Sequence, residues 1–410
     1  MFEKQLEAFE KFSKLKVGAL FMQMGSGKTK VALELVKHNN VDFMLYITPY
    51  STKANIQEEI DKWNINCDYE IIGYETIQSS DKEYLRILKK LENKRNFIIA
   101  DESIFIKNEE TKRFKRLCQL RNKCEYALIL NGTPLTKNEW DLYNQMFFLS
   151  PLIIKMNRND FLNTFFKKII YKKRGEKENT FYKFSEINAN YLYKLIDPYI
   201  FKCDLNFKKQ EKETYNYIKY EGDKYNLEKE RKYNEYIKYK NGDAIISLLT
   251  NLNVISSVYN KKNDEIIKYI NNKRIIVYCS YLSEIEYIKG KCDCFVITGK
   301  TKNRKEIFDK FKNNCKPLLL TFGVGSYSFN LQYCNEIVYS SLNFDYGKIE
   351  QSKFRIKRIG QEKDIQYTYF LTNLGINKII LENLKKKKTL EELIKEKIKE
   401  GELEKWIKNL

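Results

Sequence analysis

Short apolar runs alternate with helix-like stretches over residues 1–150 of the chain, and each run ends in a polar or glycine-bearing turn. This alternation is typical of βαβ units around a parallel sheet. The strands that it predicts span residues 17–23, 43–48, 96–100 and 126–131. Their turns span residues 25–29, 48–51, 101–103 and 132–136. Because ligands bind where the carboxyl ends of parallel strands face the loops, we expect these turns to meet at one edge of a sheet.

A second block with the same alternation spans residues 269–373. Its predicted strands span residues 274–279, 294–298, 317–322, 336–340 and 366–371. Between the blocks, residues 151–268 are rich in Lys, Tyr and Glu, and their charge pattern predicts a helical insertion. Residues 374–410 alternate Leu and Ile with Lys and Glu at helical spacing, which predicts a helical tail. The sequence therefore predicts an α/β chain with two tandem parallel-sheet lobes.

The charge balance favours a polyanionic partner, because Lys and Arg outnumber Asp and Glu by 74 to 54. An A/T-rich coding sequence would also produce this abundance of Lys, Asn, Ile and Tyr, so charge alone favours nucleic acid only modestly. The nine cysteines lack paired C-x-x-C spacing, which supports neither a zinc site nor a disulfide framework. The start of the chain does not resemble a signal peptide, and no apolar run is as long as a membrane span. A soluble, intracellular protein is expected.

A glycine-rich turn at residues 24–29 follows the first predicted strand and precedes a helical pattern. It reads Met24, Gly25, Ser26, Gly27, Lys28 and Thr29. Backbone amides of such a turn can cradle phosphates at the N-terminus of a helix. Lys28 would neutralise the β and γ phosphates, and the Thr29 hydroxyl would bind Mg²⁺. Met22 replaces the first glycine of the common pattern, and a chance glycine-rich turn is the alternative interpretation.

Two adjacent carboxylates, Asp101 and Glu102, directly follow the apolar run at residues 97–100. A carboxylate at a strand end opposite a phosphate loop can hold Mg²⁺, and its neighbour can orient or deprotonate the attacking water. We assign Asp101 to the metal ion and Glu102 to the water. Alone, such a pair is most often a solvated turn. Together with Lys28 it predicts a metal-dependent nucleotide site.

These motifs resemble, in order, those of the Swi/Snf-like ATPases of helicase superfamily 2. Residues 24–29 read M-G-S-G-K-T, close to the M-G-x-G-K-T of that family, and residues 101–108 read D-E-S-I-F-I-K-N, similar to D-E-A-H-x-I-K-N. Residues 130–135 read L-N-G-T-P-L, similar to L-T-G-T-P. Residues 351–361 read Q-S-K-F-R-I-K-R-I-G-Q, similar to Q-A-x-x-R-x-x-R-I-G-Q. The resemblance covers roughly residues 1–375, and the ordered set of motifs is far more specific than any single one.

The resemblance implies two RecA-like lobes that share one ATP and Mg²⁺ site. Gln5 stands where the family places its adenine-contacting glutamine. Arg355 and Arg358 would act as arginine fingers, which reach from the second lobe to the γ phosphate and stabilise charge in the transition state. The residues implied to couple hydrolysis to movement are Gly132, Thr133, Pro134, Asn330, Gln351 and Gln361. The implied activity is that of an ATP-dependent translocase on double-stranded DNA.

A translocase of this kind holds the DNA backbone, which positions the protein without reading sequence. Small polar turns on both lobes match the DNA-facing motifs of the family. The residues implied to bind DNA are Thr48, Ser51, Tyr74, Thr76, Ser280, Tyr281, Thr301 and Lys302. Solvated turns of Ser, Thr and Tyr are common, so this interpretation has a strong structural alternative. Protein partners could bind the helical insertion or the tail.

The sequence departs from the family at positions that concern coupling. Ile104 replaces the histidine of D-E-A-H, so the usual link from the carboxylate turn to neighbouring motifs cannot form in the same way. Ser326 and Ser328 replace glycines before Asn330. Two other functions therefore remain open. One is a strand-separating helicase on DNA or RNA, and the other is an ATP-gated DNA-binding clamp or recruitment factor with weak hydrolysis.

Overall fold

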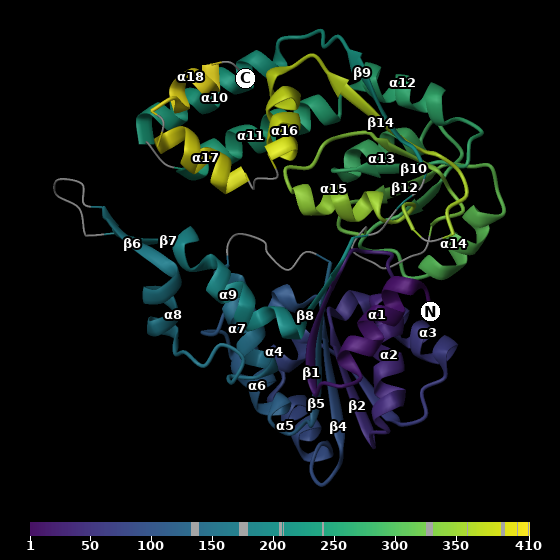
Figure 1. The fold of residues 1–410 in the computed structure, drawn as a ribbon. Helices are drawn as coiled ribbons and strands as arrows, with labels where there is room; N and C mark the ends of the chain where they lie inside the picture. The colour runs from purple at the N-terminus through teal and green to yellow at the C-terminus, as the bar shows by residue number, and fades with distance from the viewer. Residues whose placement is uncertain are drawn as a thin grey trace. The chain divides into compact units, whose positions relative to one another are not determined.

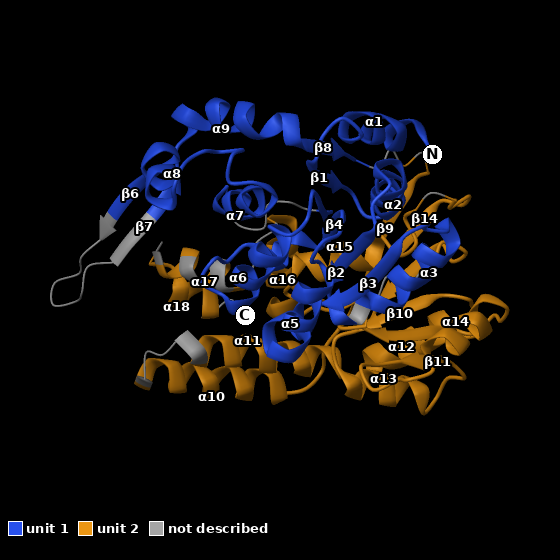
Figure 2. Ribbon diagram, turned by 90° about the horizontal axis from the view of Figure 1, so that it is seen from below, with its two compact units in different colours: residues 1–206 blue, residues 207–410 orange. Residues whose placement is uncertain are grey.

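Two units, residues 1–206 and 207–410, make up the chain, and Figure 2 colours them separately. The computed structural model describes residues 1–132, 139–171, 179–204, 207, 209–239, 242–324, 331–358, 360–386, 390–399, 401–408 and 410. Within these ranges, no helix combines the length and the apolar character that crossing a membrane requires. The range predicted as an insertion is divided between the units at residues 206 and 207. The finer domain boundaries at residues 150, 268 and 373 stay predictions.

The first unit is built on a parallel sheet with the strand order β3-β2-β4-β5-β1-β8 (Figure 1). The strands of the sheet are β1 (Val17–Met22), β2 (Phe43–Thr48), β3 (Asp68–Gly73), β4 (Asn96–Asp101), β5 (Tyr126–Asn131) and β8 (Ile200–Cys203). A separate antiparallel hairpin consists of β6 (Phe166–Tyr171) and β7 (Asn179–Phe184). The inner strands β2, β4 and β5 are buried along their whole length, which explains their nearly unbroken apolar sequences.

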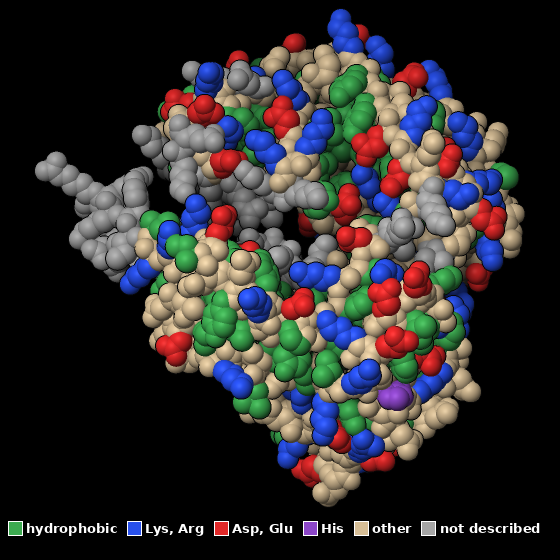
Figure 3. All heavy atoms as spheres, viewed as in Figure 1, with side chains coloured by type: hydrophobic (Ala, Val, Ile, Leu, Met, Phe, Trp, Pro, Cys, Tyr) green, Lys and Arg blue, Asp and Glu red, His purple; other side chains and the backbone are tan. Residues whose placement is uncertain are grey.

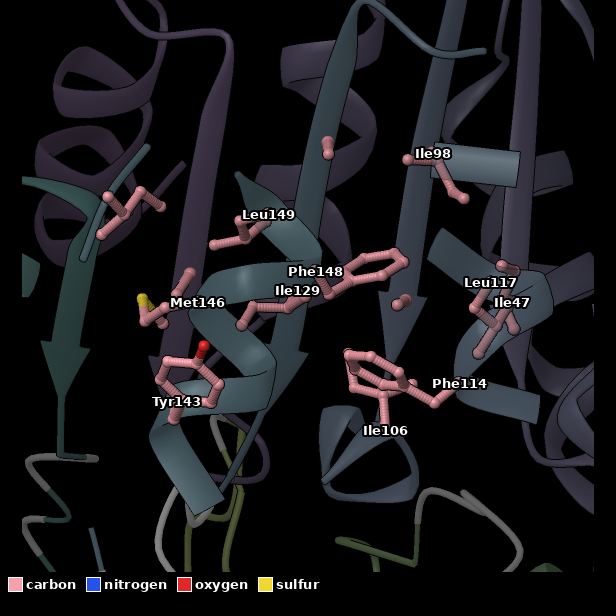
Figure 4. Packing of buried hydrophobic residues seen from close by; sticks show 14 of the residues in the cluster. Ile47, Ile98, Ile106, Phe114, Leu117, Ile129, Tyr143, Met146, Phe148 and Leu149 are labelled. Atoms are coloured by element: carbon pink, nitrogen blue, oxygen red, sulfur yellow. The ribbon is translucent and has the colours of Figure 1, made fainter. Parts of the chain in front are cut away.

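Helices cover both faces of this sheet. The helices of the unit are α1 (Glu3–Phe12), α2 (Lys28–Asn39), α3 (Lys53–Trp63), α4 (Tyr74–Ser79), α5 (Asp81–Lys90), α6 (Lys112–Arg121), α7 (Trp140–Leu149), α8 (Arg158–Phe165) and α9 (Ala189–Ile196). Helices α1 to α3 share one hydrophobic cluster with alternate residues of the strands, including Leu20 and Tyr46. Helices α4 to α9 share a second cluster with the residues on the opposite face, including Ile98 and Ile129 (Figure 4).

We expect a Phe161→Ala substitution to destabilise the first unit by about 3–5 kcal/mol, because Phe161 is fully buried and alanine would leave a cavity. The Phe161 ring contacts the rings of Trp140, Tyr143, Phe165 and Phe166. Chemical denaturation would measure the free energy of unfolding. Leu85→Ala, at an exposed position on α5, is the control and should change it by less than about 0.5 kcal/mol. Equal effects of the two substitutions would contradict this packing.

The second unit repeats the architecture, with a parallel sheet in the order β11-β12-β10-β13-β14-β9. Its strands are β9 (Glu211–Ile218), β10 (Ile276–Cys279), β11 (Phe295–Ile297), β12 (Leu318–Thr321), β13 (Glu336–Tyr339) and β14 (Ile365–Thr372). Its helices are α10 (Lys224–Tyr239), α11 (Gly242–Ser257), α12 (Asn260–Ile270), α13 (Leu282–Lys289), α14 (Arg304–Lys312), α15 (Tyr346–Lys353), α16 (Gly375–Lys386), α17 (Leu390–Lys399) and α18 (Leu403–Lys408). Two α/β lobes, each on its own parallel sheet, are what the alternating blocks predict.

The predicted helical tail is confirmed as α16, α17 and α18, and it belongs to the core of the second unit. Leu393 and Ile407 of the tail join a hydrophobic cluster that also contains Leu248 of α11. The buried Tyr225 hydroxyl of α10 donates a hydrogen bond to the Leu410 carbonyl over 2.8 Å. Helices α12 and α13 cover the opposite face of the sheet.

The range predicted as a helical insertion contains α8 to α12 but also strands that we did not predict. Strand β8 extends the first sheet beside β1, with Ala19 opposite Ile200. Strand β9 extends the second sheet beside β14 along its whole length. Both strands lie at sheet edges, where one side of the strand stays unpaired and polar residues are tolerated. The polar composition of β9 therefore resembled that of the exposed helices around it, whereas β8 is only four residues long.

Candidate functional site

The phosphate loop lies between β1, which ends at Met22, and α2, which begins at Lys28. Gly25 and Gly27 adopt left-handed backbone conformations, with φ of 82° and 83°. A Cβ atom at Gly27 would lie 2.2 Å from the Gln5 side-chain nitrogen, so only glycine fits there. The first backbone amides of α2 have no partner within the helix, as is general for helix N-termini, and they suit phosphate. This local structure is the one that the motif predicts.

Gln5 of α1 is buried against the phosphate loop. Its Nε2 donates a hydrogen bond to the Ser26 carbonyl over 2.8 Å, and its Oε1 accepts one from the Phe2 amide over 3.1 Å. The structure therefore brings Gln5 and the loop together, although they are far apart in the sequence. Its contact with adenine stays a prediction.

The carboxylate turn follows β4, which is separated from β1 only by β5. Burial raises the pKa of Asp101, while the charge of Lys28 acts in the opposite direction. The Tyr46 hydroxyl of β2 donates to Asp101 Oδ2 over 3.2 Å. Burial and the Asp101 charge raise the pKa of Tyr46, and a hydrogen bond with Thr29 lowers it. Tyr46 thus hydrogen-bonds one predicted metal ligand, Asp101, and lies close to the other, Thr29. Sequence reasoning missed it.

Glu102 has a left-handed backbone, with φ of 54° and ψ of 55°. Outside glycine, this conformation costs about 1–2 kcal/mol and is concentrated at functional sites. Glu102 immediately precedes the short 3₁₀ helix η2 (Ser103–Ile106). The turn thus changes chain direction directly after Asp101, so that the two adjacent carboxylates belong to different backbone elements.

The predicted DNA-facing turns of the first unit lie next to each other and to the carboxylate turn. The Tyr50 amide donates to Glu75 Oε2 over 3.0 Å, and the Tyr74 hydroxyl donates to the Asp101 carbonyl over 2.8 Å. Thr48 and Tyr74 are fully buried, so their side chains are not available for the predicted contact with DNA. Thr76 is half-buried, and the neighbouring Tyr50 is 67% exposed. The structure describes the backbone of Ser51 but not its exposure.

In the second unit, the predicted DNA-facing residues follow β10 and β11. Ser280 and Tyr281 are half-buried, and their backbone amides both donate to the buried Glu284 carboxylate, over 3.1 and 3.0 Å. The half-buried Thr301 accepts a hydrogen bond from the Thr298 amide over 2.9 Å. Lys302 is exposed. These are two separate turns at the loop edge of the second sheet.

The two predicted arginine fingers lie just beyond α15. Helix α15 ends at Lys353, and a hydrogen-bonded turn follows, in which the Arg358 Nε donates to the Phe354 carbonyl over 2.8 Å. Arg355 is only 3% exposed, and Arg358 is half-buried. Burial raises the pKa of Tyr278 to about 12, and the charges of both arginines oppose this rise.

The predicted coupling residues are described only in part. A Cβ atom at Gly132 would lie 3.4 Å from the Met24 Cγ, so Gly132 is packed against the phosphate loop. Gln361 is buried and its Nε2 donates to the Cys334 carbonyl over 2.9 Å, whereas Gln351 is half-buried. Thr133, Pro134 and Asn330, together with Ser326 and Ser328, lie outside the described residues.

Two parallel sheets, one of which carries a phosphate loop and a carboxylate turn at its loop edge, define a helicase-like P-loop ATPase. The sequence matches the model of the SNF2-related domain over residues 7–255. It also matches the model of the helicase conserved C-terminal domain over residues 260–360. The chain belongs to the SNF2-related family.

Individual relatives are distant. The chain is 21% identical to the human DNA annealing helicase and endonuclease ZRANB3, in a match that covers 94% of the chain and 40% of the relative. It is 24% identical to an uncharacterized ATP-dependent helicase of Mycoplasma pneumoniae, over 85% of the chain and 37% of the relative. The chain thus spans less than half the length of these relatives. Among solved structures, the Sulfolobus solfataricus SWI2/SNF2 ATPase core in complex with dsDNA matches 91% of this chain and 88% of its own, with 22% identity and a TM-score of 0.43.

Proposed function

We propose that the chain is an ATP-dependent translocase that tracks along double-stranded DNA. The observation that carries the proposal is the hydrogen bond from Tyr74 to the Asp101 carbonyl, because it joins a candidate DNA-facing turn directly to the candidate hydrolytic turn. A translocase needs such a connection between the surface that binds DNA and the site that hydrolyses ATP. The family membership supports ATP as the substrate.

The residues around Tyr46 fit a magnesium ion. Thr29 and Asp101 supply hydroxyl and carboxylate oxygens, which are the ligands that Mg²⁺ prefers. Within the described ranges, no group of three or more His, Cys, Asp and Glu side chains could hold a metal ion without further ligands. Phosphate oxygens and water would therefore complete the site, as is usual for Mg²⁺ bound with a nucleotide. When bound, the ion neutralises charge on the phosphates.

In the proposed mechanism, Lys28 and the amides at the start of α2 hold the phosphates. Glu102 orients the attacking water and takes its proton, which is the role of a carboxylate base within reach of a nucleophile. Arg355 and Arg358 stabilise the charge that develops on the transferred phosphoryl group. A conformational change that depends on the nucleotide state then converts hydrolysis into movement.

The proposed contact with DNA is electrostatic and independent of sequence. The half-buried or exposed residues that we propose to contact DNA are Thr76 and Tyr50 on the first unit and Ser280, Tyr281, Thr301 and Lys302 on the second. Hydroxyl, amide and ammonium groups suit phosphate oxygens. On the face drawn in Figure 3, Lys and Arg side chains of both units are interspersed with Asp and Glu. The net charge of +20 therefore supports binding in general rather than marking one patch on that face.

We expect duplex DNA to raise the rate of ATP turnover severalfold, since DNA bound at the 73–76 turn would act on the carboxylate turn through Tyr74. Steady-state ATP turnover with and without a linear duplex is the measurement. Lys28→Ala, which removes the phosphate-binding ammonium group, is the control for contaminating ATPases. A triplex-displacement assay then tests movement along the duplex.

Other outcomes identify the alternatives. ATP binding without stimulation by duplex DNA would contradict the proposal and favour an ATP-gated clamp. Unwinding of a fluorescent forked duplex, without triplex displacement, would favour a strand-separating helicase. ATP turnover by Lys28→Ala at the rate of the unsubstituted protein would contradict the nucleotide site itself.

A further inference from the structure

A buried hydrogen bond joins the carboxylate turn to α7. The Ser103 hydroxyl, one residue after Glu102, donates to Gln145 Oε1 over 2.5 Å, and neither Ser103 nor Gln145 is exposed to solvent. The Gln145 Nε2 donates in turn to the Asp141 carbonyl of the same helix over 2.8 Å. Both polar ends of the glutamine amide are therefore satisfied, which fixes its orientation.

Helix α7 also contacts the far end of the same turn. The Asn144 Nδ2, adjacent in sequence to Gln145, donates to the Lys107 carbonyl over 2.6 Å. Between these two attachments, Ile106 of η2 packs in one hydrophobic cluster with Met146 and Phe148 of α7 (Figure 4). Closely packed groups of this kind move together rather than deform separately. We therefore expect the carboxylate turn and α7 to move together as one rigid element.

Both parts of this element, α7 and the carboxylate turn, lie close in the chain to residues of the proposed nucleotide site. Helix α7 begins at Trp140, eight residues after Gly132, and Gly132 packs against Met24 of the phosphate loop. Ser103, which α7 contacts through Gln145, directly follows Glu102 and its left-handed backbone. The next residue, Ile104, has no polar side-chain group. Ser103 is thus the residue beside Glu102 whose hydroxyl reaches α7.

We propose that Ser103 and Gln145 are positioning residues for ATP hydrolysis. Their hydrogen bond holds the carboxylate turn in the conformation that directs Glu102 at the attacking water, and it links that turn to α7. Ser103 thus forms the polar contact next to Glu102. The apolar side chain of Ile104, one position later, cannot form a hydrogen bond. The inference rests on the proposed nucleotide site, in which neither residue touches ATP.

The test compares the kcat and KM for ATP of Ser103→Ala, Gln145→Met and the double variant. Each single variant is expected to lower kcat about tenfold and to leave KM within about twofold, because positioning acts on the transition state and not on ATP binding. The double variant is expected to be no slower than either single one, since residues that act through one contact are not additive. Ser103→Cys, which keeps a weak donor, is expected to recover part of the lost kcat.

Tyr84→Phe is the matched control. It removes another hydroxyl-to-glutamine hydrogen bond in the first unit, between Tyr84 of α5 and Gln119 of α6, which does not involve the carboxylate turn. It should leave kcat unchanged, and it should cost less stability in chemical denaturation than Ser103→Ala, because Gln119 is exposed to water whereas Gln145 is buried.

Several results would overturn the inference. One is an unchanged kcat in folded Ser103→Ala, and another is an equal loss of kcat in Tyr84→Phe. Recovery of kcat in the double variant would assign the loss to a buried polar group without a partner rather than to a missing link. If the unsubstituted protein hydrolyses no ATP, the proposed function fails as well. If it does and Ser103→Ala matches it, only the positioning role fails.

Discussion

ATP turnover by a Glu102→Gln variant is expected to fall by a factor of about 10² to 10⁴, while ATP still binds. Glutamine keeps the size of glutamate and its hydrogen-bonding oxygen, but it cannot accept the proton of the attacking water. Lys28 and the glycines of the phosphate loop are unchanged, so the phosphates keep their contacts. Steady-state turnover measures the first effect, and calorimetric titration with ATP measures the second.

The control for this substitution is Glu10→Gln, which removes the same charge from an exposed position on α1. It should change neither turnover nor ATP affinity. A Glu102→Gln variant that loses ATP affinity together with turnover would place Glu102 among the groups that bind the nucleotide or its metal ion. Unchanged turnover would show that another group activates the water.

The sequence predicted the inner strands of both sheets well, and the reason is physical. Strands such as β4 and β5 are buried on both faces, so their apolar runs are continuous and have no helical period. The strands that we missed are β3, β8 and β9, which lie at the edges of the two large sheets, and β6 and β7, which form the separate hairpin. In β9, every second residue is exposed and five of its eight residues are polar or charged. Only its pairing with β14 identifies it as a strand.

The candidate site shows the same division between local and long-range information. The phosphate loop and the carboxylate turn were predictable because each depends on a few consecutive residues. Tyr46 and Gln145 were missed, since their contacts with Asp101 and Ser103 join residues that lie 55 and 42 positions apart. A tyrosine two residues before the end of a buried strand was the only local signal for Tyr46.

Tyr74 illustrates that a polar turn does not determine which of its side chains are exposed. Its place in a polar turn suggested a side chain that faces DNA, but the ring is fully buried and its hydroxyl donates to the Asp101 carbonyl. The exposed Phe105 stacks on it at 5.2 Å, and the guanidinium group of Arg113 lies over the Phe105 ring. The exposed ring at this point is therefore that of Phe105, with the half-buried Arg113 over it, and the motifs assigned no role to either residue.

Replacing Arg358 with alanine is expected to lower ATP turnover by a factor of about 10³ or more, since an arginine that stabilises transition-state charge contributes on this scale. ATP affinity should change little, because the groups proposed to bind the phosphates belong to the first unit. Arg358 is a better test than Arg355, because Arg355 is only 3% exposed and its removal would also leave a cavity. Turnover and ATP affinity are measured as for Glu102→Gln.

Two further variants determine what Arg358 supplies. Arg358→Lys keeps the charge but loses the planar fork, so it is expected to stay almost as slow as Arg358→Ala if the fork binds two phosphoryl oxygens. Arg274→Ala removes an exposed arginine at the amino end of β10, opposite the loop edge, where it donates to the Lys312 carbonyl over 2.9 Å. It should leave turnover unchanged. If Arg358→Ala and Arg274→Ala hydrolyse ATP equally fast, Arg358 takes no part in the reaction, and its proposed role in stabilising transition-state charge is wrong.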